Sequence, residues 1–245
     1  MIIAEELRVN VFEIGANQVG KSGYADIPVP AQLIILNDAQ IAWVKARLGE
    51  NNIYRKGVEE FTKRFHDLEH LVVFYEARPL RKKQPEDAYG THYVDARKEY
   101  PQLMYYLDAY CLAKRGECGN RKVDLTLVQH GQLADKYGDA NHGPDFYWGE
   151  ALLTFSEGQI KVHTRDFRAT DLHVTYVRYP KRISLLDDED GQPITWFDGR
   201  REYQDCELPY YAKDEIRDIA LHLTGLYREN PNLIQAAQQR LAMNE

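Results

Sequence analysis

The sequence contains one motif of the kind that binds nucleotide phosphates. Residues Gly15 to Ser22 read Gly-x-x-x-x-Gly-Lys-Ser, a loop whose backbone amides hold phosphates while Lys21 reaches the terminal ones. Such a loop must run directly into a helix, because the helix N-terminus supplies the amides and a favourable dipole. Here Gly23 follows Ser22 at once, and Pro28 leaves room for only a short helix. A flexible loop is the favoured interpretation, and a P-loop nucleotide-binding enzyme using Lys21 and Ser22 is the alternative.

Two groups of histidines and carboxylates have the residue types of metal or acid–base sites. His66 and His70 have the spacing of the zinc helix His-Glu-x-x-His, but Asp67 replaces the general-base Glu and no third ligand stands out. Surface histidines are favoured there, and a metal-dependent hydrolase is a third hypothesis. A second group lies in a turn-rich region and comprises His130, Asp135, His142 and Asp145. Its spacing fixes no geometry, so turn formation is the simpler explanation. No catalytic, cofactor-binding or metal-binding residue is predicted.

Composition narrows the class of protein. The 245 residues suffice for one large domain or two modest ones. A formal net charge of −7 argues against a nonspecific grip on nucleic acid, which needs a basic surface. No apolar run reaches membrane-spanning length, and Glu5 and Glu6 follow the start, so neither a signal peptide nor an anchor is expected. Three cysteines without Cys-x-x-Cys spacing suit free thiols in a reducing cytoplasm.

The stretch from Val58 to Tyr75 has the clearest helical pattern. Its apolar residues recur at steps of three and four, at Val58, Phe61, Phe65, Leu68, Val72 and Tyr75. A stripe of this kind needs partner helices, because each large side chain left exposed forfeits roughly 1.5–3 kcal/mol. Partner helices are predicted from Pro30 to Gly49, after Leu208–Pro209, and from Pro231 to the C-terminus.

Elsewhere the apolar pattern has the period of two that is typical of strands. The predicted strands are 5–14, 105–114, 123–129, 148–155, 159–163 and 172–179. Turn residues at 116–120 and at Glu157–Gly158 join four of these strands into two hairpins. Between the hairpins a short helix is expected over 130–138.

Two charged segments are predicted to lie at the surface. Residues 78–98 contain Pro79, Pro85 and Gly90 and are interpreted as an extended loop or arm. Its basic cluster is a candidate contact for an acidic partner and consists of Arg78, Arg81, Lys82 and Lys83. Residues 187–206 form an acidic surface excursion.

The predicted fold class is therefore α+β, in one subunit covering residues 1–245. A small bundle of about four helices is expected over 28–76 and 208–243. Antiparallel β-hairpins are expected to form a sheet or sandwich over 103–185, between helices two and three.

Four short motifs occur in a fixed order along the chain. They are Leu36–Asn37–x–Ala39–Gln40, Asp67–Leu68–x–x–Leu71–Val72, Tyr176–x–Arg178–x–Pro180–x–x–Ile183, and Glu207–Leu208–Pro209 leading into Glu215–Ile216–x–Asp218–Ile219–Ala220. In this order they resemble the head-to-tail connector, or ring, proteins of tailed phages that infect Bacteroidetes, including the crAss-like phages. The likeness covers nearly the whole chain, except the segments 78–98 and 187–203.

This resemblance implies a structural, non-enzymatic virion protein without cofactors. It implies a subunit made in the host cytoplasm that assembles, with roughly twelve-fold symmetry, into a ring of the virion neck. The ring would join the portal to a downstream tail or second ring protein and pass DNA during ejection without binding it tightly. The resemblance implies no membrane partner. In similar adaptors the C-terminal segment docks on the portal, which gives a partner-facing role to Leu233, Ile234, Leu241 and Met243.

Overall fold

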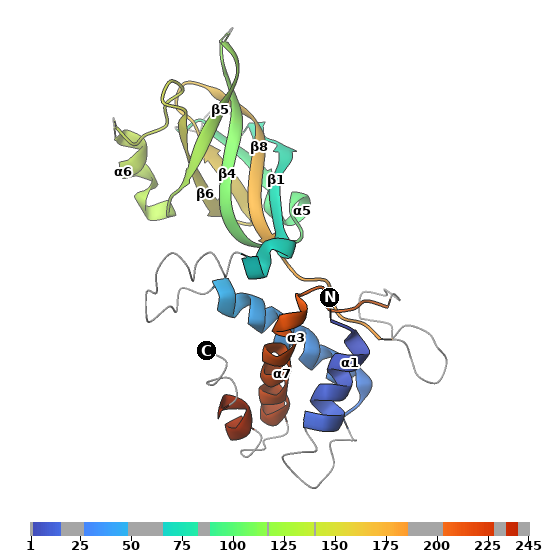
Figure 1. Ribbon diagram of the computed structural model, residues 1–245. Helices are drawn as coiled ribbons and strands as arrows, with labels where there is room; N and C mark the ends of the chain where they lie inside the picture. Colours follow the sequence, from blue (N-terminus) through green and yellow to red (C-terminus); the bar gives the residue numbers. More distant parts are fainter. Residues whose placement is uncertain are drawn as a thin grey trace. The chain divides into compact units, whose positions relative to one another are not determined.

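The computed structural model describes residues 2–15, 27–48, 66–82, 89–116, 118–139, 141–185, 203–227 and 234–239 (Figure 1). The chain divides into two compact units. The helical unit comprises Met1–His70 with Pro180–Glu245, and the sheet unit comprises Leu71–Tyr179. This mixture of helices and a sheet confirms the predicted α+β class. A small four-helix bundle, in contrast, is not formed by the described residues, since part of the expected second helix belongs to the sheet.

The N-terminal segment predicted as a strand over 5–14 is helical. It forms α1 (Ala4–Arg8), which continues into the π-helix η1 (Val9–Gly15). Ala4, Leu7 and Val11 are fully buried, and their spacing of three and four residues is that of one helix face. Leu7 and Val11 also fit an alternating pattern, because a separation of four satisfies both periods. Among the described residues, no helix is both long and apolar enough to cross a membrane.

The helix predicted from Pro30 to Gly49 is confirmed as α3 (Val29–Leu48). It packs against α7 (Lys213–Tyr227), which follows the short 3-10 helix η5 (Tyr210–Ala212) and confirms the helix expected after Leu208–Pro209. The apolar face of α3 is buried at Leu33, Leu36, Ala39, Trp43 and Val44. A last helical stretch covers 234–239, within the predicted C-terminal helix.

The predicted helix over Val58–Tyr75 is wrong in its C-terminal part. Residues 66–68 are helical and η3 (Glu69–Leu71) continues them, but Val72–Pro79 forms strand β1, paired with β8. The run of β-branched and aromatic residues from Val72 to Tyr75 favours a strand. A bulge interrupts the pairing between Val73 and Glu76, where Tyr75 takes a φ of 48°. The rest of the predicted helix, 58–65, lies outside the described residues.

The sheet unit is built on one eight-stranded sheet with the order β1-β8-β4-β5-β6-β7-β3-β2. Only the β5–β6 pair is parallel. The strands after β1 are β2 (Arg81–Lys82), β3 (Thr91–Asp95), β4 (Leu103–Arg115), β5 (Cys118–Leu127), β6 (Glu150–Ser156), β7 (Gln159–His163) and β8 (Arg168–Arg178). The short helices are α5 (Ala96–Glu99), η4 (His130–Gln132) and α6 (Leu133–Gly138).

Both predicted hairpins are confirmed, as are the strand predicted over 172–179, which is β8, and the helix over 130–138. At the β6–β7 turn, Glu157 and Gly158 have φ values of 57° and 76°. Positive φ at both central residues matches the strand twist in a two-residue hairpin. Local turn chemistry therefore sets the register of this pair, from Ser156–Gln159 to Leu152–His163.

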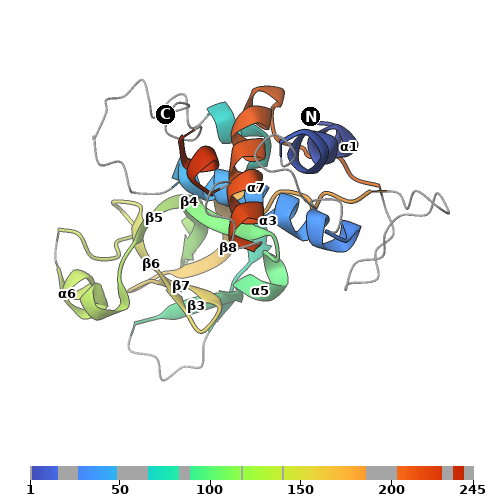
Figure 2. The same ribbon diagram turned by 90° about the horizontal axis from the view of Figure 1, so that it is seen from below.

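The sheet closes on itself. Strands β1 and β2 occupy its two opposite edges, yet only Leu80 separates them in the chain. Because consecutive Cα atoms are about 3.8 Å apart, the two edges must meet at this residue. Figure 2 shows the strands arranged around a common interior. The interior is filled by apolar side chains that include Cys111, Val123, Leu153, Ile160, Leu172 and Val174.

This closure overturns the extended arm predicted for 78–98. Its described residues end β1 and form β2, β3 and α5, while 83–88 lie outside the described residues. The acidic excursion over 187–206 is also wrong at its end. Cys206 is fully buried, and its backbone exchanges hydrogen bonds with Ile2 at 2.9 and 3.1 Å. Residues 186–202 lie outside the described part.

In the helical unit, the buried side-chain amides of Asn37 and Gln40 join the first motif to the third. The Asn37 side chain accepts a hydrogen bond from the Ile183 amide (2.9 Å) and donates to the Ile183 carbonyl (3.1 Å). Gln40 donates to the Asn37 side chain (2.9 Å) and to the Lys181 carbonyl (3.0 Å). The side-chain amides of Asn37 and Gln40 thus provide hydrogen-bond partners for backbone groups of Lys181 and Ile183. Among the described residues, these two positions have no partner in a strand.

A second group of contacts joins the other two motifs through α3. Arg47 pairs with Asp67 at 3.1 Å and also with Glu215 of α7. Trp43 donates its indole N–H to Glu215 at 2.6 Å, and Tyr211 donates its hydroxyl to Asp67 at 2.7 Å. Asp67 is only 4% exposed, so its charge requires these partners. The polar residues of the motifs thus hold the helical unit together.

Replacing Asn37 with alanine is expected to destabilise the helical unit. The change leaves the buried amide and carbonyl of Ile183 without this partner, at a cost of roughly 2 kcal/mol or more. Urea unfolding followed by circular dichroism measures the loss. Asp38→Ala, an exposed position on the same helix, is the matched control and should change stability little. Equal effects of the two substitutions would contradict the bridging role of Asn37.

Candidate functional site

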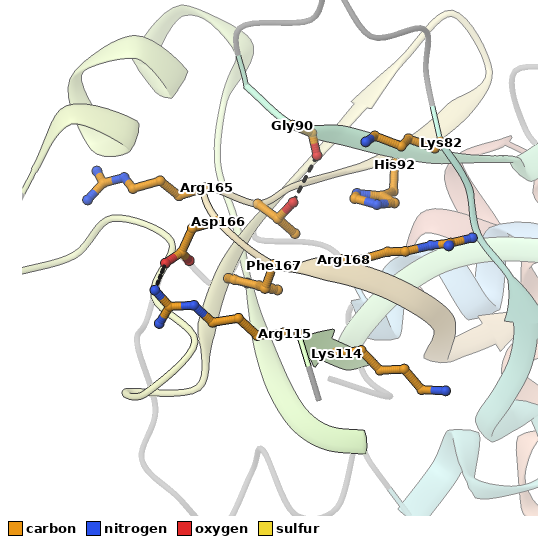
Figure 3. Close-up of a pocket in the computed structure, with 11 residues that line it drawn as sticks. Lys82, Gly90, His92, Lys114, Arg115, Arg165, Asp166, Phe167 and Arg168 are labelled. Atoms are coloured by element: carbon orange, nitrogen blue, oxygen red, sulfur yellow. Dashed lines mark hydrogen bonds and ion pairs between the residues drawn. The ribbon is translucent and has the colours of Figure 1, made fainter. Parts of the chain in front are cut away.

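The sheet unit contains a cavity of about 330 Å³ whose lining is strongly basic (Figure 3). We call it the cationic cavity. Three strand ends meet around it. The β2–β3 region contributes Lys82, Gly90 and His92, and the end of β4 contributes Lys114, Arg115 and Gly116. The connection from β7 to β8 and the start of β8 contribute Thr164, Arg165, Asp166, Phe167 and Arg168.

A glycine contact fixes one wall of the cavity. Thr164 donates its hydroxyl to the Gly90 carbonyl at 2.9 Å, and Tyr137 donates its hydroxyl to the Thr164 carbonyl at 3.2 Å. Gly90 has a φ of 55°, and a Cβ at this position would lie 2.4 Å from the Thr164 carbonyl oxygen. Only glycine fits here, because both the conformation and the close approach exclude a side chain.

The innermost lining residues are almost fully buried. His92, Thr164 and Phe167 are 2%, 1% and 7% exposed. Phe167 packs on Phe146 with the ring centroids 5.7 Å apart, which anchors this wall in the apolar core. The cavity therefore has a rigid base, and its basic groups lie nearer to solvent.

Two of the basic groups have partners within the unit. Arg115 pairs with Asp166 at 2.5 Å and lies over the Tyr147 ring at 5.0 Å. Arg165 donates to the Tyr137 carbonyl, and its guanidinium lies 5.5 Å from the centroid of the Tyr137 ring. Among the described lining residues Asp166 is the only carboxylate, and its charge is engaged by Arg115.

The other three cations are exposed and form no ion pair with any described residue: Lys82, Lys114 and Arg168. Figure 3 shows the charged ends of Lys114 and Arg168 on the opposite side of the group from Asp166. Lys114 and Arg168 are direct partners in the β4–β8 register. Like charges directly opposite each other destabilise a sheet. The arrangement therefore concentrates positive charge that the described residues do not balance.

The candidate partner-binding residues fall into different places. Arg78 in β1 is held by Glu76 and Glu99 and by the ring of Tyr100, so its role is structural. Arg81 is exposed and pairs in register with Tyr93, whereas Lys82 lines the cationic cavity.

The C-terminal candidates are mostly beyond what the structure describes. Ile234 is half-buried at the start of the helical stretch 234–239. The remaining candidates lie outside the described residues: Lys83, Leu233, Leu241 and Met243.

Sequence reasoning did not single out Lys114, Arg115, Arg165 and Arg168. Two signals were available. One is the basic pair Lys114–Arg115 beside the turn at Gly116, and the other is the group of charged residues between the predicted strands 159–163 and 172–179. These segments are about 50 residues apart, and the antiparallel pairing of β4 with β8 brings them together.

The alternative chemical sites gain no support from the described residues. His66 is exposed and pairs with Glu69 at 3.1 Å, and His142 is exposed and lies 2.9 Å from Asp139. The Asn141 amide and the His142 side chain lower the pKa of Asp139. No group of three or more potential metal ligands occurs among the described residues.

Asp145 has the predicted turn role. Its carboxylate accepts hydrogen bonds from the amides of Tyr147 and Trp148 at 2.6 and 2.9 Å. The Gly15–Ser22 motif lies outside the described residues apart from Gly15, which ends a helix rather than the strand that a phosphate-binding loop follows.

Two cysteines are buried free thiols, in accord with the sequence. Burial raises the pKa of Cys111 to about 12 and that of Cys206 to about 11. Neither supplies a thiolate near neutral pH, so neither is suited to act as a nucleophile.

Removing one cation from the cavity is expected to stabilise the unliganded sheet unit. Lys114→Gln relieves the repulsion from Arg168, a gain of about 0.2–1 kcal/mol at low salt that shrinks as salt screens the charges. Urea unfolding at low and high salt measures both effects. Lys122→Gln on β5 is the control, because Lys122 pairs with Asp124 at 3.2 Å and its loss should not stabilise. A destabilised Lys114→Gln would instead assign Lys114 a structural role.

The chain was compared with known proteins. No family model matches it, and no curated protein is significantly similar to it.

Proposed function

We propose that the protein is a structural, non-enzymatic subunit of a ring that joins the capsid portal of a tailed phage to its tail. The observation that carries the proposal is the order of the four motifs together with their convergence in the helical unit. Asn37, Asp67 and Glu215 come from three different motifs, and all three contact other elements of that unit.

The resemblance is built from short motifs, and it is stronger because residues of different motifs make contacts within the same unit. Four weak matches scattered over a surface would have no common physical cause. Residues whose polar side chains contact other elements of one unit are constrained together, because leaving one buried partner unsatisfied costs about 1–3 kcal/mol. The resemblance therefore concerns the part of the chain that sets its fold, and the fold of a ring subunit is what presents its contact surfaces.

Exposed aromatic side chains offer surfaces for contact with neighbouring subunits. Trp148 is 82% exposed and Tyr147 is 68% exposed, side by side in the loop before β6. Tryptophan and tyrosine are enriched in the buried centres of protein interfaces, where their large apolar area is removed from water. A ring in which each copy contacts two neighbours buries such residues.

The distribution of charge suits a channel that passes DNA. The sheet unit has 15 basic and 15 acidic residues and is formally neutral. The helical unit has 16 basic and 23 acidic residues, so it carries the whole net charge of −7. An acidic surface repeated around a lumen repels phosphates over about 8 Å at physiological salt, which opposes adhesion of the passing DNA.

The decisive experiment is assembly with the cognate portal. Purified full-length protein, alone and mixed with portal protein, is examined by mass photometry and negative-stain microscopy. We expect rings with a central opening, either spontaneous or formed on the portal. A protein that stays monomeric under both conditions and does not bind the portal would falsify the proposal.

Trp148→Ala is expected to weaken assembly without unfolding the subunit. The exposed indole makes little contribution to the fold, whereas at an interface its truncation typically costs 2 kcal/mol or more, about a thirtyfold loss in affinity per contact. Mass photometry reports assembly and thermal unfolding reports the fold. Unchanged assembly by a normally folded variant would exclude Trp148 from the contacts between subunits.

The C-terminal candidates are tested in the same way. A double variant, Leu241→Ser with Met243→Ser, should lose portal binding while its far-ultraviolet circular dichroism stays like that of the wild type. Normal portal binding by this variant would argue that another surface docks on the portal.

A further inference from the structure

We propose that the cationic cavity of the sheet unit is a binding site for a phosphate group. The proposal stands on the geometry of the sheet unit and does not depend on ring assembly. It gives a role to three lining cations that are exposed and form no ion pair with any described residue: Lys82, Lys114 and Arg168.

The arrangement of the cations has an energetic cost. Lys114 and Arg168 face each other across β4 and β8, and Lys82 lines the same cavity from β2. Cations gathered in this way repel one another, and Asp166, the one carboxylate among the described lining residues, is already paired with Arg115. A bound anion removes this repulsion, because each cation then gains an opposite charge. The cavity is therefore selective for anions.

The number and type of hydrogen-bond donors suit a phosphate group. Arg168 presents a planar guanidinium with several N–H groups, which suits two oxygens of one phosphate, and the two lysines add ammonium donors. A phosphate monoester carries about 1.5 to 2 negative charges and three acceptor oxygens near neutral pH. A single carboxylate carries one charge and two oxygens, so it neutralises the cluster less completely. The cluster thus favours phosphate over an acidic side chain.

The size of the cavity suits a small anion. A cavity of about 330 Å³ lies at the small end of the range of ligand pockets, roughly 300–1,000 Å³. It exceeds the volume of a water molecule, about 30 Å³, by roughly tenfold. This room admits a phosphate group with its first waters or with a small attached group. A double helix does not enter such a volume, so DNA could offer only a terminal phosphate or a single backbone phosphate.

The base of the cavity limits where the anion binds. Phe167 and Thr164 are nearly inaccessible to solvent, and the Thr164 hydroxyl is engaged by the Gly90 carbonyl. The bound phosphate must therefore lie toward the mouth, among the flexible ends of the three cations. Binding there is expected to depend strongly on salt, since the participating charges are exposed.

Isothermal titration calorimetry of the full chain with inorganic phosphate at low salt tests the site. We expect saturable binding with one phosphate per chain. Arg168→Gln should weaken it about tenfold or more, because a charge-assisted hydrogen bond is worth about 1.5–3 kcal/mol. Asp166→Asn should strengthen it, because Arg115 is then released from its pair. Lys122→Gln, an exposed lysine paired with Asp124 outside the lining, should bind as the wild type does.

Further titrations identify the source of the phosphate. One uses a short single-stranded oligonucleotide with a 5′-phosphate, and another uses the same oligonucleotide with a 5′-hydroxyl. Binding that needs the 5′-phosphate points to a terminal or free phosphate, and equal binding of both points to the backbone; both outcomes support the site. Arg168→Lys keeps the charge and should bind better than Arg168→Gln.

Three results overturn the proposal. One is no binding of any phosphate ligand to the folded wild type. Another is equal weakening by Arg168→Gln and Lys122→Gln, which would show only a general charge effect. The third is preferential binding of an acidic peptide, for which residues 186–191 of this chain supply a probe sequence, over inorganic phosphate and both oligonucleotides.

Discussion

The helical unit depends on polar side chains of α3 that hold segments distant in sequence. Asn37 binds both backbone groups of Ile183, and Arg47 pairs with Asp67 and Glu215. Asp67 lies just before the chain leaves this unit, and Ile183 lies just after the chain returns to it. One helix therefore fixes both the departure and the return of the chain. Apolar packing alone would not specify these positions, because it is not directional, whereas amides and ion pairs require one geometry.

Local signals in the sequence were sufficient for much of the sheet. The apolar pattern predicts strands close to the observed β4 to β8, and the Glu157–Gly158 turn carries its own conformational preference. The α+β class and helices α3 and α7 also follow from periodicity. The errors had two different causes. Leu7 and Val11 fit both a strand and a helix, and Val72 and Tyr75 continued a helical stripe although pairing with β8 decided their conformation.

The cationic cavity was beyond local reasoning for a different reason. Lys82 was singled out as part of a basic cluster, but its neighbours in space come from the ends of β4 and β8. Their proximity follows from the closure at Leu80, which is a long-range property of strand order. Arg78 illustrates the opposite case. It belongs to the same basic cluster in sequence, yet Glu76 and Glu99 use its charge for the fold. Sequence identifies charge, and the fold decides which charges remain available.

The pairing of β1 with β8 has a consequence for how such a chain can be assembled from parts. The sheet unit begins on β1 and ends on β8, and Val72 and Val177, near its two ends, are direct partners across the ladder. Partners of this kind have Cα atoms about 4.5–5.5 Å apart. The two ends of the sheet unit therefore lie close together, as the ends of a short loop do. Inserting this unit into the rest of the chain adds little entropic cost of loop closure. A unit with this construction can be exchanged, enlarged or deleted between proteins while the helices around the insertion point stay the same.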